Sequence, residues 1–168
     1  MSVSLYQASV PAFIRMLDNL SGILGKAAAY TEARKIDPSV LIEARLYPDM
    51  LPLSMQVKIA TDHAKGAGAR LAGITPPVFA DTEKTFAELA ERINKTVVFL
   101  KTIKPEQMDG AEERAITLTI QTRTFNFNGM DYLFNFAQPN FYFHITTVYA
   151  ILRHNGVEIG KRDFMGGM

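Results

Sequence analysis

Three histidines are the side chains of this sequence best suited to chemistry near neutral pH: His63, His144 and His154. An imidazole exchanges a proton in that range and ligates transition metals. On a helical projection, His63 lies about 80° from the centre of an apolar stripe, in a row with Gln56 and Arg70. His144 lies about 60° from the apolar Phe141 on a second helix. Both histidines therefore border a buried face, and we expect them to meet if the two helices are neighbours.

His154 is excluded from such a pair, because it follows His144 by about 15 Å along the same helix. A catalytic transition-metal site typically takes three protein ligands plus water. The position one turn after His144 is Val148, so only two imidazoles are available, and a third ligand would have to come from Asp62, Tyr149 or a loop. Two interpretations stay open: a tentative metal site at His63 and His144, or two hydrogen-bonded histidines in a polar pocket or core.

Three further side chains complete the candidate pocket of Asp62, His63, His144, Tyr149 and Arg153. Asp62 is placed to orient another group of the site or to ligate the metal. Arg153 is placed to hold an anionic group of a substrate. Tyr149 lies on the opposite flank of its helix from His144, which also fits a packing role.

Composition excludes several classes of function. The chain of 168 residues has no cysteine, which rules out a thiol nucleophile, a disulfide scaffold and a zinc ribbon. Its net charge is +1 without a Lys or Arg run, so we expect no nucleic-acid partner. The chain is long enough for one domain, residues 1–168, with a core of its own.

A membrane span is not expected, although the segment from Tyr132 to Leu152 contains no Asp, Glu, Lys or Arg. Polar side chains in its middle, among them Asn135, Gln138 and His144, would be left unpaired in hydrocarbon. The first sixteen residues lack the basic start of an export signal. We therefore expect a cytoplasmic protein.

Apolar residues at intervals of three and four predict helices before residue 105. Ser4 is expected to cap the first helix and Pro11 to kink or restart it. Asp81 or Thr82 is expected to cap the third helix, on which Glu88 and Arg92 would pair on the solvent side. The apolar stripes are Phe13, Leu17, Leu20, Leu24 and Ala27 in the first helix; Leu53, Val57, Ala60, Ala64, Ala67 and Leu71 in the second; and Phe86, Leu89, Ile93, Val97, Leu100 and Ile103 in the third.

Apolar residues alternate with polar ones in residues 116–120 and 125–127. This spacing of two predicts a small β-hairpin that turns near residues 121–123. A short helix over residues 129–137, broken by Pro139, is expected next. Asn140 would then cap a last helix with Phe141, Ile145, Val148 and Leu152 on its buried face. In residues 157–168 the apolar residues show no spacing that predicts a helix or a strand.

Three stretches resemble a bacterial branch of the DinB/YfiT-like superfamily whose function is unassigned, the domain of unknown function 1993. They are RLYPDM (residues 45–50), DHAKGAGARLAG (62–73) and PNFYFHITTVYAILRHNGVEIGKRDF (139–164). The resemblance implies a mainly all-α fold, an up-down four-helix bundle with a long crossing connection, and commonly a homodimer. In better-known members it implies a nickel or zinc site of three histidines, and in some a thiol-dependent transferase. His63 and His144 match two of the ligand positions, and Val148 stands at the third.

Two functions follow as hypotheses. The first is a metal-dependent enzyme, thiol-transferase-like or hydrolase-like, with a polar pocket around His63 and His144 that holds a small molecule and a divalent transition metal, nickel or zinc. The second is a non-catalytic binding or dimerisation module that keeps the fold, has no cofactor and lacks a complete metal site. Val148 favours the second.

Overall fold

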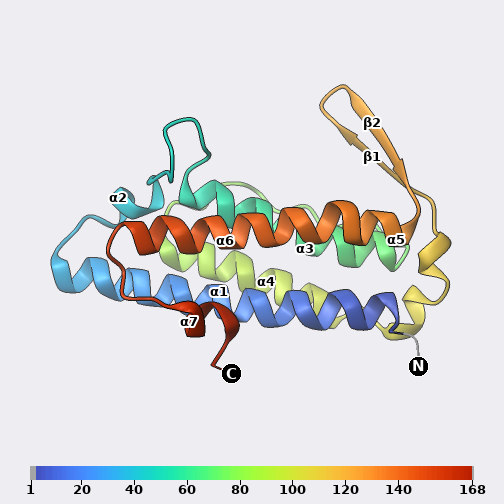
Figure 1. Cartoon of the computed structure of the whole chain (residues 1–168), viewed down its shortest axis with the longest axis horizontal. Helices are drawn as coiled ribbons and strands as arrows, with labels where there is room; N and C mark the ends of the chain where they lie inside the picture. The colour runs from blue at the N-terminus through green and yellow to red at the C-terminus, as the bar shows by residue number, and fades with distance from the viewer. Residues whose placement is uncertain (1–2, 168) are drawn as a thin grey trace.

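The long helices form a four-helix bundle, as expected. The computed structural model describes residues 3–167, and its bundle consists of α1 (Leu5–Arg34), α3 (Leu53–Leu71), α4 (Phe86–Lys101) and α6 (Gln138–His154). Helices α1 and α6 run in one direction and α3 and α4 in the other (Figure 1). Because α3 and α4 run in parallel, the connection of residues 72–85 must return along the bundle. The mainly all-α class and the long crossing connection are thus confirmed.

Short elements join and close the bundle. Figure 1 shows the β-hairpin standing away from the bundle beside α5, and α7 lying along α1. Their bounds are α2 (Pro38–Ile42), the 3-10 helices η1 (Pro105–Met108) and η2 (Ala111–Glu113), strands β1 (Ile116–Ile120) and β2 (Arg123–Phe127), α5 (Gly129–Asp131), the π-helix η3 (Tyr132–Ala137) and α7 (Lys161–Met165).

The core follows the predicted apolar stripes. Every residue of these stripes is buried, and Phe13 of α1 meets Phe141 of α6 edge to face with ring centroids 4.7 Å apart. Helix α3 packs on both α4 and α6. Small residues allow this close packing, since a Cβ on Gly68 would stand 2.7 Å from Leu100 of α4. Helix α3 is therefore the central element on which the candidate site is built.

The hairpin is confirmed. Strands β1 and β2 are antiparallel and pair Ile116 with Phe127 and Ile120 with Arg123, so the turn lies at residues 121 and 122. Ile116 and Leu118 are buried, whereas every other residue of β1 is exposed. The alternation of the sequence thus reports which face of the ribbon turns to the helices.

Several local expectations were wrong. Helix α1 is continuous through Pro11, so the fresh start considered there does not occur; the proline removes one hydrogen-bond donor within the helix. The cap of α4 is Thr85, whose hydroxyl accepts from the Glu88 backbone while the Glu88 carboxylate accepts from Thr85. Neither Asp81 nor Thr82, the two expected caps, begins the helix, and Asp81 is 3.0 Å from the guanidinium of Arg92 instead. Ile103 is buried but lies after the end of α4.

The prediction that Glu88 and Arg92 pair on the solvent side of the helix was also wrong. Arg92 is only 2% exposed, because the connection of residues 72–85 covers that side of α4. Glu88 is engaged at the helix start rather than with Arg92. A periodic pattern reports the stripe that faces other helices, and it contains no signal for a loop that covers the opposite flank.

Pro139 does not break the chain into two helices. It lies in the first turn of α6, which continues from the π-helix η3 without interruption, and the Gln138 backbone donates five residues back to Leu133. The wider π turn changes the hydrogen-bond register just where proline lacks its donor. Asn140 is not a cap, and its amide donates to the Phe136 carbonyl at 2.7 Å.

Two further elements, α2 and α7, lie in segments for which no helix was expected. Within residues 3–167, no helix is both long and apolar enough to cross a membrane. Met1, Ser2 and Met168, the ends of the expected domain, lie outside the described residues.

Candidate functional site

His63 of α3 and His144 of α6 lie side by side, as their helical positions predicted. Their ring centroids are 5.8 Å apart and their planes differ by 13°. Phe136 of η3 contacts His63 edge to face at 5.6 Å, and Phe143 contacts His144 in the same way at 5.3 Å. Both imidazoles are half-buried. Two residues 81 positions apart in the chain therefore form one aromatic, polar group between α3 and α6.

Gln56 fixes the protonation pattern of His144. Its amide nitrogen donates to the Leu51 carbonyl at 3.0 Å, which turns its oxygen, Oε1, toward His144 Nδ1 at 2.6 Å. An amide oxygen only accepts, so Nδ1 carries the proton and donates. The neutral His144 ring then has its free lone pair on Nε2.

Both histidines are held neutral. Burial, with the neighbouring His144 and Arg70, lowers the pKa of His63 to about 4, although Asp62 opposes the shift. Burial also lowers the pKa of His144. A charged imidazole loses hydration in this environment, so the site presents uncharged rings at neutral pH.

An open pocket of about 200 Å³ adjoins His63. It lies between α3, strand β1 and the start of the continuous η3 segment, and we call it the His63 pocket. The Tyr132 hydroxyl accepts from Arg70 Nη1 at 3.1 Å on its wall. Burial raises the pKa of Tyr132, and Arg70 only partly opposes this, so the hydroxyl keeps its proton. The lining residues are Asp62, His63, Arg70, Leu118, Thr119, Ile120, Tyr132 and Phe136.

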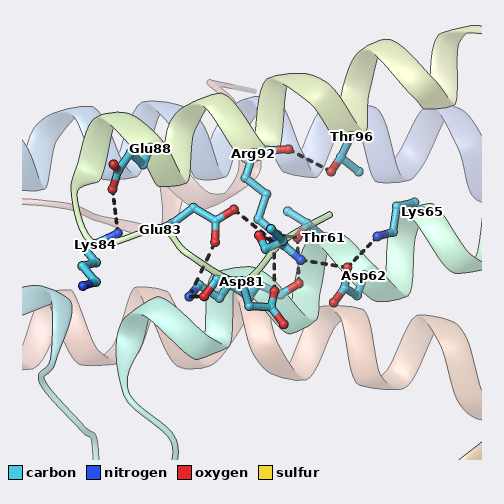
Figure 2. A network of polar contacts seen from close by, with 11 residues as sticks. Thr61, Asp62, Lys65, Asp81, Glu83, Lys84, Glu88, Arg92 and Thr96 are labelled. Atoms are coloured by element: carbon cyan, nitrogen blue, oxygen red, sulfur yellow. Dashed lines mark hydrogen bonds and ion pairs between the residues drawn. The ribbon is translucent and has the colours of Figure 1, made fainter. Parts of the chain in front are cut away.

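Asp62 connects this pocket to a group of charges around the buried Arg92, which we call the Arg92 cluster (Figure 2). The Arg92 guanidinium donates to Thr61, Glu83 and Asp62 at 2.8, 3.0 and 2.9 Å. Burial by itself would raise the pKa of Glu83, but hydrogen bonds from its own backbone and from Arg92, together with the charges of Arg92 and Lys58, hold that pKa below its ordinary value. The ionic members are Lys58, Asp62, Lys65, Asp81, Glu83 and Arg92.

The other predicted site residues lie elsewhere. Tyr149 packs edge to face on Phe164 of α7, with ring centroids 5.9 Å apart. Arg153 and His154 are exposed in the last turn of α6. The lining of the His63 pocket includes Asp62 and His63 but not Tyr149, Arg153 or His144. His144 joins the site only through its stacked contact with His63.

The donor set does not complete the three-histidine metal site that the resemblance implied. In a shared complex each ring centre would stand about 3.2 Å from the ion, so a separation of 5.8 Å is within reach of two ligands. Val148 at the third position is fully buried and has no donor. Between residues 3 and 167, no three His, Cys, Asp or Glu side chains gather closely enough to hold an ion. The residues therefore fit two ligands and not three.

Sequence reasoning gave no role to Gln56, Arg70 and Tyr132, which hold or line the site. For Gln56 and Arg70, the spacing in the sequence already indicated a place beside His63. Gln56, His63 and Arg70 follow one another at seven-residue intervals, which places them on one flank of a helix with a drift of only about 20° per step. Tyr132 carried no such signal, because its contact with Arg70 joins two distant elements.

The fold and the paired histidines define a DinB-type helical bundle, and comparison of the sequence gives the family. The chain belongs to the family described as Domain of unknown function (DUF1993), which matches residues 5–165. A crystal structure of a DinB family member protein from Shewanella denitrificans is similar over 98% of this chain and 93% of that one, with 41% identity and a TM-score of 0.88. The sequence has no significant match among curated proteins.

Proposed function

We propose that this DinB-family protein is a binding module for a small polar molecule, which it holds in the His63 pocket. The observation that carries the proposal is a neutral, half-buried imidazole on the wall of an open pocket that also contains Asp62, Arg70 and Tyr132. Ligand sites typically combine apolar walls with a few placed polar groups. A neutral imidazole can both donate and accept a hydrogen bond without the cost of burying a charge.

The size of the pocket limits the ligand. At about 30 Å³ for each water-sized group, 200 Å³ holds roughly seven such groups. Leu118 and Ile120 of β1 supply apolar surface opposite the polar wall of α3. The ligand class is therefore a compact molecule with one apolar side.

Protein-observed NMR with a set of compact fragments, neutral and charged, tests the proposal. Bound fragments should shift the imidazole signals of His63 and the backbone signals of residues 118–120, and His63→Phe should weaken that binding. His154→Phe is the matched control, because His154 is exposed at the end of α6. If no fragment shifts His63, or if His63→Phe binds like the wild type, the proposal fails.

A two-histidine site for a divalent transition metal, nickel or zinc, is the second candidate, and the 5.8 Å separation of two neutral imidazoles favours it. A metal-dependent enzyme would require this site. Its test is the metal content of untagged protein by mass spectrometry. Stoichiometric metal that disappears in His63→Ala and in His144→Ala would support it, and metal-free wild type after growth with both metals would remove it.

The homodimer expected from the family is retained as a proposal, with light scattering as its measurement. Apolar side chains exposed on the hairpin and on α6, such as Phe125 and Phe143, support it.

A further inference from the structure

Arg70 is a cation that has no anionic partner among residues 3–167. The Arg92 cluster balances three cations against three carboxylates, and Lys65 and Arg92 both contact Asp62 Oδ1 at 2.9 Å. Arg70, on the same helix as Lys65, forms no ion pair within residues 3–167. A half-buried guanidinium without a counter-ion retains a strong attraction for anions, because less water screens it than at the open surface.

Gly66 provides the space in which the Arg70 side chain lies. A Cβ built on Gly66 would collide with Arg70 Nη1, and it would stand 3.8 Å from the Tyr132 hydroxyl. Arg70 therefore folds back by one helical turn over a position that has no side chain, and Tyr132 then accepts one of its hydrogen bonds at 3.1 Å. Two residues thus position the guanidinium.

The guanidinium occupies the boundary of two pockets. Arg70 lines the His63 pocket and also a neighbouring pocket of about 360 Å³ that contains Lys65 and Phe79. A guanidinium has five N–H donors in a planar fork, and the structure shows one of them given to Tyr132. The fork matches a carboxylate, whose two oxygens accept in parallel.

We propose that Arg70, placed by Gly66 and Tyr132, makes the His63 pocket select small monocarboxylates. The inference rests on the proposed function, since it names the class of molecule that the pocket binds. One unbalanced positive charge matches one carboxylate, and a compact planar acid fits the volume of about 200 Å³. Asp62 does not oppose such a ligand, because Lys65 and Arg92 balance its charge.

Titration with benzoate and benzamide tests the inference, because the two molecules have nearly the same shape and differ in charge. Both are added to the full chain at constant ionic strength and followed by the signals of the Arg70 side chain and the His63 ring. Benzoate should bind at least about tenfold more tightly than benzamide, the usual scale for a charge-assisted pair. Arg70→Gln should reduce benzoate to the affinity of benzamide, whereas Arg34→Gln, which removes an exposed charge from α1, should leave it unchanged.

Gly66→Ala provides a second variant that keeps every charge. Alanine favours a helix over glycine, so the variant should unfold at the same or a higher temperature. Its methyl group displaces the guanidinium, and benzoate affinity should fall at least about fivefold. This variant keeps the test valid if Arg70→Gln fails to fold.

The outcomes separate the two proposals. Equal affinities for benzoate and benzamide, with shifts at His63 in both titrations, would overturn the selection of carboxylates and leave the small-molecule site standing. Absence of shifts at His63 in both titrations would overturn both proposals. Wild-type affinity for benzoate in Gly66→Ala and in Arg70→Gln would also overturn the assignment to Arg70.

Discussion

The Arg92 guanidinium on α4 donates to Asp62 Oδ1 on α3 at 2.9 Å, and Asp62 directly precedes His63 in the chain. A buried charge on one helix therefore fixes the wall of the pocket on another. The same guanidinium donates to the Ala80 carbonyl at 3.0 Å, which ties the crossing connection to both helices. Stability and the shape of the site are coupled through this residue.

Replacement of Arg92 by methionine should therefore destabilise the chain. Loss of one partner from a buried ionic group costs about 3 kcal/mol or more. We expect a loss at the low end of this range, because the side chains of Asp62 and Asp81 are 45% and 57% exposed and water can solvate their carboxylates. Urea unfolding measures the change. Lys95→Met, at an exposed position of the same helix, should change the free energy of unfolding by no more than about 0.5 kcal/mol, and equal effects in the two variants would contradict the role of the cluster.

The stability of the fold should depend on pH through His63. Its pKa is about 4 in the folded chain and 6.5 in the unfolded chain, so the unfolded state binds the additional proton between these values. The free energy of unfolding should fall by about 1 to 2 kcal/mol from pH 7 to pH 5 because of this residue. In His63→Gln this part of the dependence should disappear, as urea unfolding at the two pH values will show. An identical pH dependence in the variant would argue against a neutral, buried His63.

The contact between Gln56 and His144 should control the protonation of His144. A carboxylate at position 56 would stand where the amide oxygen now accepts from Nδ1, so Gln56→Glu should raise the pKa of His144 by at least about one unit. NMR titration of the imidazole signals measures it, with the exposed His154 as the internal reference. In the wild type, nitrogen shifts should show the proton on Nδ1. A proton on Nε2 would mean that the Gln56 amide has the opposite orientation.

The start of α4 offers a direct comparison of two threonines. Thr85→Ala removes the side-chain oxygen that accepts from the Glu88 backbone and should cost about 1 kcal/mol in thermal or urea unfolding. Thr82→Ala changes a residue of the same type that lies before the helix and should have little effect. A larger loss of stability in Thr82→Ala than in Thr85→Ala would indicate that Thr82 is the cap.

The sequence predicted most of the helical frame because that frame depends on local geometry. Residues three and four apart share a helix face, so the buried stripes with Phe13, Val57 and Phe141 follow from spacing alone. The same geometry placed His63 and His144 at the edges of their stripes, and adjacent packing of α3 and α6 then brought the rings together.

What local geometry could not predict depends on the path of the chain between helices. Arg92 is buried because residues 72–85 cover its side of α4, and Pro139 lies in the first turn of α6, which continues from a π turn. Loop paths follow from contacts between distant residues and leave no period in the sequence. Spacing alone thus determined the bundle and the angular position of each imidazole. The tertiary structure decided which charges are paired. Among residues 3–167 it joins Asp62 to Lys65 and Arg92, and it places Arg70 beside the pocket against Gly66 and Tyr132 without an ion pair.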